Sequence, residues 1–153
     1  MVTMLLMIVL SFIIPWLTAG YVYKRAPKIF FTVAPFAALI ALILNQLGIQ
    51  TNLWTIHTSS NVGMLNTVFL DLGIFTISAV WFTYFMYYKE KQPAWIYPIF
   101  VLGMTGVEFT ALSIHLLTYH EKWSIFYTFL MYLGGFITIH LIIRKLDKLE
   151  VYP

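Results

Sequence analysis

Four polar residues interrupt long apolar stretches of the sequence, and they are the best candidates for chemistry. They are Asn45, Asp71, Glu108 and His115. An ionisable residue near the centre of a bilayer costs about 2.5–3.5 kcal/mol on insertion scales, so inside a membrane-spanning segment it is by default a hypothesis for a functional site. Carboxyl, amide and imidazole groups brought together could share a proton or a cation, or hold a metal ion.

The spacing of these residues predicts one shared cluster. With a helical rise of 1.5 Å per residue, Asp71 lies about 12 Å and Glu108 about 15 Å from the outer ends of their segments. His115 follows Glu108 by two helical turns and is therefore expected on the same face, about 10 Å nearer the outer surface. Asn45 ends a stripe of small residues that would allow a close helix contact. The alternative is that the cluster only ties helices together through hydrogen bonds, and we favour this structural interpretation.

The elements that must position these residues are membrane-spanning helices. Of 153 residues, 61% are hydrophobic and 10% are charged, whereas soluble domains have about 45–50% and about 25%. A helix needs about 20 apolar residues to cross a bilayer. The sequence predicts an all-α, polytopic transmembrane helix bundle with a single integral membrane domain over residues 1–153. Its spans are expected at about 2–22, 29–49, 63–88, 94–118 and 124–143.

The basic residues predict the orientation of the bundle. All of them except Lys122 fall on one side of a five-span arrangement. The positive-inside rule then places the amino terminus outside and the carboxyl terminus in the cytoplasm. The outer loop 50–62 is polar and uncharged, and it either lies along the surface or dips into it.

Several other residues carry structural expectations. Trp54, Tyr119 and Trp123 are expected at the outer interface, as amphipathic aromatic rings prefer. His140 is expected to snorkel at the cytoplasmic end, and the tail 144–153 to continue the last helix briefly. Close helix packing is expected at glycines within the last two spans, which are Gly103, Gly106, Gly134 and Gly135.

Many functional classes lack their sequence signals. The chain has no cysteine, which excludes thiolate metal sites, redox pairs and a cysteine nucleophile. The basic residues lie in short clusters between apolar runs instead of on one face, so no nucleic-acid partner is expected. No H-E-x-x-H, Walker or G-x-S-x-G motif is present. We therefore expect no catalytic residues, no metal site and no cofactor.

Glu108, Trp123 and the pair Tyr127-Thr128, in this spacing, resemble the carboxyl-terminal signature of an uncharacterised family of small polytopic membrane proteins of endospore-forming Bacillota. The resemblance extends from about the third span onward, and Asp71 would match an acidic residue of that span. The chain departs from the family at Thr76, where proline is usual, and at His115, where threonine is usual. The resemblance implies the topology and a bacterial plasma membrane, and it leaves the activity open.

Three functional hypotheses follow. The leading one is a non-enzymatic accessory or structural component of the bacterial plasma membrane, whose partners are the lipid bilayer and other membrane proteins or a second copy of itself. The alternative is a small oligomeric transporter or channel in which Asp71 and Glu108 carry a proton or cation. An intramembrane metal-dependent enzyme using Glu108, His115 and Asp71 ranks last, because catalytic sites usually show more converging polar groups.

Overall fold

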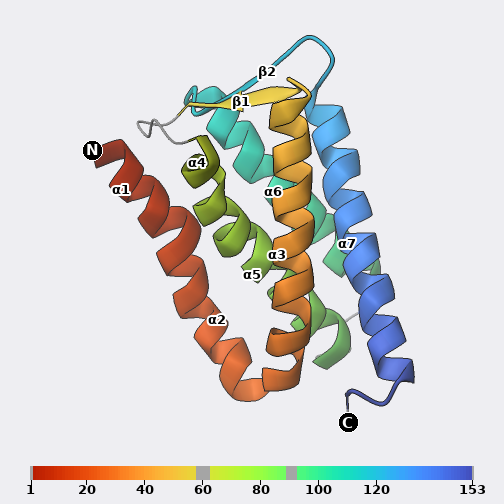
Figure 1. Cartoon of the computed structure of the whole chain (residues 1–153). Coiled ribbons are helices and arrows are strands. Elements are labelled where there is room, and N and C mark those ends of the chain that lie inside the picture. Colours follow the sequence, from red (N-terminus) through yellow and green to blue (C-terminus); the bar gives the residue numbers. More distant parts are fainter. Residues whose placement is uncertain (1, 58–62, 89–92, 153) are drawn as a thin grey trace.

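The protein is a bundle of helices that are long and apolar enough to cross a membrane (Figure 1). The computed structural model describes residues 2–57, 63–88 and 93–152. Five spans are found in this part of the chain, which confirms the predicted fold class. They are formed by α1 (Val2–Ile8), the π-helix η1 (Val9–Ile13) and α2 (Ile14–Arg25); by α3 (Pro27–Gln50); by α4 (Gly63–Leu70), η2 (Asp71–Phe75), α5 (Thr76–Thr83) and η3 (Tyr84–Tyr88); by α6 (Pro93–Ser113); and by α7 (Ile125–Lys148).

The third span forms the centre of the bundle. Half of its apolar window is buried within the protein, against about a fifth for each of the other spans. Val80 and Phe82 of α5 are fully buried in the main core, together with Val22 of α2 and Ile29 of α3. The other four spans present most of their surface outward, where the hydrocarbon of a bilayer suits apolar side chains.

The first and third spans cross at their π-helical segments. A Cβ added to Gly73 in η2 would lie 1.9 Å from the carbonyl oxygen of Ser11 in η1, so only glycine allows this approach. Trp16 strengthens the crossing, because its indole Nε1 donates a 2.9 Å hydrogen bond to the carbonyl oxygen of Leu72. Each π segment adds a residue to its turn, and such segments occur frequently at functional sites.

A short two-stranded antiparallel sheet forms a cap over one end of the bundle. Strand β1 (Trp54–Ile56) follows α3, strand β2 (Leu117–Tyr119) follows α6, and the two pair antiparallel with Trp54 opposite Tyr119. Figure 1 shows the chain beginning near this cap and ending at the opposite end of the bundle. Two side-chain bonds of 2.9 Å reinforce the strand pair, His57 to Thr118 and Thr55 to His120.

The cap corrects two expectations. The fourth span ends at Ser113, so its predicted extension to residue 118 is wrong, and strands occur where none were expected. Trp54 lies in the cap at one end of the bundle and is 5% exposed, because its ring packs on Gly48 at the last turn of α3. Residues 58–62 of the outer loop, and the basic residues Lys89 and Lys91 used for the orientation, lie outside the described residues.

The carboxyl-terminal tail differs from its expectation in part. Helix α7 continues to Lys148 as expected, but the chain then folds back against the bundle. Tyr152 is buried, and its hydroxyl group lies 2.6 Å from the Thr32 hydroxyl of α3.

Candidate functional site

Glu108 is the centre of a hydrogen-bond network that joins the cap to the last helix. Tyr132 of α7 donates to Oε2, and Tyr119 of β2 donates to Oε1. The Thr128 hydroxyl also donates to Oε1, at 3.0 Å. The Tyr119 and Thr128 hydroxyl groups also lie 2.6 Å apart, so their two hydrogens are shared among three contacts. An ionised carboxylate offers about four acceptor positions, and two or three of them are therefore occupied by side chains of the protein itself.

The indole of Trp123 extends this network toward the cap. Its Nε1 donates a 2.9 Å hydrogen bond to the Thr128 hydroxyl, and its ring packs against that of Trp54 with centroids 5.0 Å apart. Burial, followed by the nearby charge of Glu108 and the hydrogen bond to it, holds the pKa of Tyr119 well above its ordinary value. Tyr119 therefore remains a neutral hydrogen-bond donor.

Asp71 belongs to a second polar group, which joins α3 to the third span. The Asn45 amide of α3 donates to Asp71 Oδ1, and the neighbouring Gln46 amide donates to the Thr67 hydroxyl at 3.3 Å. Asp71 and Thr67 are both fully buried, which agrees with the expected interior position of the carboxyl group. Among the described residues, Asp71 Oδ2 is the one buried side-chain oxygen or nitrogen atom without a hydrogen-bond partner.

The backbone at Asp71 is also distinctive. Asp71 begins the π segment η2, and the Thr76 hydroxyl donates a 2.6 Å hydrogen bond to the Asp71 carbonyl oxygen five residues earlier. The π turn thus brings Thr76 beneath Asp71. Ser78 is only partly buried, and its hydroxyl contacts the Met104 sulfur at 3.2 Å.

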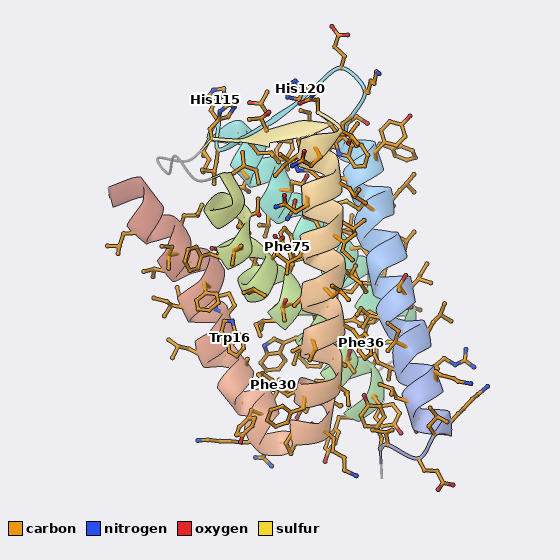
Figure 2. The ribbon with its side chains drawn as sticks, in the orientation of Figure 1. Trp16, Phe30, Phe36, Phe75, His115 and His120 are labelled. Atoms are coloured by element: carbon orange, nitrogen blue, oxygen red, sulfur yellow. The ribbon has the colours of Figure 1, made fainter. Side chains whose placement is uncertain are left out.

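The predicted single cluster is resolved into two groups. Asp71 bonds to Asn45, and Glu108 bonds to hydroxyl groups of β2 and α7, with no hydrogen bond between the two carboxyl groups. His115 joins neither group. It lies exposed in the turn after α6 with φ at 57°, because the helix ends before it, and Figure 2 shows it at the cap end of the molecule. The expectation that it shares the face of Glu108 is therefore wrong.

Comparisons with known proteins identify no relative of this chain. The chain matches no protein-family model, no curated protein and no solved structure. Within the described residues, no three histidine or acidic side chains come close enough to hold a metal ion.

Sequence reasoning missed the partners of Glu108. Thr128 and Tyr132 are four residues apart on α7 and therefore share a helical face, which was an available signal. His140 was also placed incompletely. It is half-buried, and its Nδ1 lies 2.7 Å from the hydroxyl oxygen of Tyr97 in α6, so it joins two helices instead of snorkelling freely.

Proposed function

We propose that this chain is a non-enzymatic structural or accessory component of a bacterial plasma membrane, with its amino terminus outside. The observation that supports this proposal is the occupation of Glu108 by Tyr119, Thr128 and Tyr132. A catalytic acid or base must reach the proton that it transfers. Glu108 instead uses most of its acceptor capacity to hold the cap and α7 in place.

The test compares two substitutions of Glu108 in the purified chain. Glu108→Gln keeps the size and an acceptor oxygen, whereas Glu108→Leu removes every acceptor. Since hydrogen bonds to charged groups contribute about 1.5–3 kcal/mol each and are not additive, Glu108→Leu should lower the free energy of unfolding in detergent by at least about 2 kcal/mol more than Glu108→Gln. Equal stability of the two variants would contradict the structural role.

A second candidate, proton or cation transfer, is favoured by the unpartnered oxygen of Asp71. Asn45 bonds to only one of the two carboxylate oxygens, and a buried charge that is incompletely hydrogen-bonded is costly. Asp71 would therefore bind a proton or a small cation, and transport would consist of taking up that ion on one side of the membrane and releasing it on the other. Asp71 also begins a π segment, and such segments occur frequently at functional sites.

A flux measurement separates the two candidates. Liposomes containing the protein and a trapped pH-sensitive dye should acidify no faster than protein-free liposomes under the first proposal, and replacing sodium by potassium outside should make no difference. Faster acidification that is lost in Asp71→Asn, at equal protein incorporation, would reject the first proposal and support the second. Faster acidification that persists in Asp71→Asn would reject the first proposal and also the role of Asp71 in the second.

A further inference from the structure

A cavity of about 140 Å³ lies under the cap, between α3, α5, α6 and α7, and part of its boundary is open. Its wall is almost entirely apolar and includes Leu44 of α3, Phe75 of η2, Ala111 of α6 and Met131 of α7. Trp54 and Leu117 of the cap also contribute to the wall. Figure 2 shows Phe75 within the bundle below the cap.

Small residues on the wall leave this space open. Gly135 of α7 lines the cavity, and a Cβ added there would meet no atom within 4 Å. Ala111 of α6 lines it as well. An engineered apolar cavity of about 150 Å³ binds benzene, so the space under the cap suits a ring or a short stretch of hydrocarbon chain.

The polar groups on the wall favour a hydrogen-bond donor in the ligand. Asn45 and Glu108 both line the cavity. The Asn45 amide nitrogen is used by Asp71, while its oxygen accepts no hydrogen bond from the described residues. Glu108 Oε2 accepts from Tyr132 and has one acceptor position left. The hydroxyl hydrogen of Tyr132 is already directed to Glu108.

Charge narrows the ligand class further. The carboxyl group of Glu108 is on the wall. An anionic head group such as a carboxylate or phosphate would meet like charge in a region of low dielectric constant, where repulsion is strong. A neutral hydroxyl group could instead donate to Glu108 or to Asn45.

From these observations we infer that the cavity is a binding site for a lipid-soluble alcohol or phenol. The apolar body fills the space between Phe75, Ala111 and Gly135, and the hydroxyl group donates to Glu108 Oε2 or to the Asn45 oxygen. Such molecules dissolve in the bilayer and enter the cavity through the open part of its boundary. This inference is independent of whether Asp71 carries an ion.

The test is photolabelling of the full chain in nanodiscs with a ten-carbon diazirine alcohol, followed by mass spectrometry to locate the labelled residues. The matched probe is its methyl ether, which has the same body and no hydroxyl hydrogen. Labelling of the cavity wall should be about tenfold weaker with the ether, because it cannot donate a hydrogen bond to a charged acceptor. Unlabelled decanol should compete, and decanoate should not.

Gly135→Leu fills the cavity and should remove wall labelling. Its control is Gly134→Leu on the same helix, where an added Cβ also meets no atom within 4 Å and the residue is exposed. If Gly135→Leu does not fold, Ala111→Leu fills the same space from α6. Unchanged wall labelling in a folded cavity-filling variant would overturn the site, and equal labelling by alcohol and ether would overturn the ligand class.

Discussion

Gly73→Ala should destabilise the crossing of the first and third spans. The added Cβ would lie 1.9 Å from the Ser11 carbonyl oxygen and 2.8 Å from the Phe12 Cα. Contacts under 3.0 Å are essentially absent from real structures, so the two helices must separate locally by at least 3.0 − 1.9 = 1.1 Å. Both opposing atoms belong to the backbone, and no change of rotamer can relieve the clash.

The expected cost follows from this displacement. Overpacking typically costs about 1–3 kcal/mol, and alanine recovers about 0.8–1.0 kcal/mol of helix propensity relative to glycine. Because a backbone must move, we expect the upper part of the range and a net loss of about 2 kcal/mol. Gly103→Ala is the matched control, since its added Cβ meets no atom within 4 Å, and it should be as stable as the unchanged protein or slightly more stable.

The assay is reversible unfolding in mixed micelles, followed by circular dichroism and by the fluorescence of Trp16. The indole of this residue makes the hydrogen bond across the crossing. If Gly73→Ala were as stable as Gly103→Ala, the argument for a glycine-dependent crossing would be wrong. The double variant Ser11→Gly with Gly73→Ala should remain destabilised, because the clash involves the carbonyl oxygen at position 11 and not its side chain. Full rescue would also refute the reasoning.

Three further predictions concern the cap and the tail. Gly48→Ala would place a Cβ 1.9 Å from the Trp54 ring, so the ring should leave the cap. Acrylamide quenching of a variant with Trp54 as its sole tryptophan should then increase, and unchanged quenching would contradict the packing of Trp54 on Gly48. The raised pKa of Tyr119 stabilises the fold fully below the ordinary tyrosine pKa of about 10, and this contribution should fall as the pH rises through the higher folded pKa. Unfolding titrations between pH 9 and 12 should therefore show a smaller loss in Tyr119→Phe, and an identical loss would count against it. Tyr152→Phe removes the contact with Thr32 and should lower the unfolding free energy by about 0.5–1.5 kcal/mol, whereas no measurable change would mean that the tail is not held by this bond.

The sequence predicts the spans well because hydropathy is a property of each segment alone. The interior position of Asp71 is predictable for a similar reason, since a carboxyl group avoids hydrocarbon. The glycines show the limit. Close packing was expected at Gly103 and Gly134, yet both face open space, while Gly48 and Gly73 make the tight contacts. In a membrane, a helix face against lipid and one against another helix are equally apolar, so one sequence does not distinguish them.

The cap escaped prediction because its information is not local. Each strand has only three residues, too few to show a period of two. The strands also come from loops separated by two spans. The prediction that His115 shares a helical face with Glu108 is wrong for a related reason. The predicted helix continued through His115, whereas the helix in the structure ends at Ser113.

The connection of β1 to β2 imposes an order on biosynthesis. A chain emerging from the ribosome presents β1 after its second span, but its pairing partner appears only after the fourth, and Thr128 and Tyr132 only with the fifth. Until then Glu108 lacks the donors of α7, and Trp54 lacks the ring of Trp123. A chain halted after four spans therefore carries a poorly solvated carboxylate in the bilayer, which distinguishes it energetically from the finished protein. The cap contacts, the carboxylate network and the enclosed space are therefore complete only once the last helix is in place.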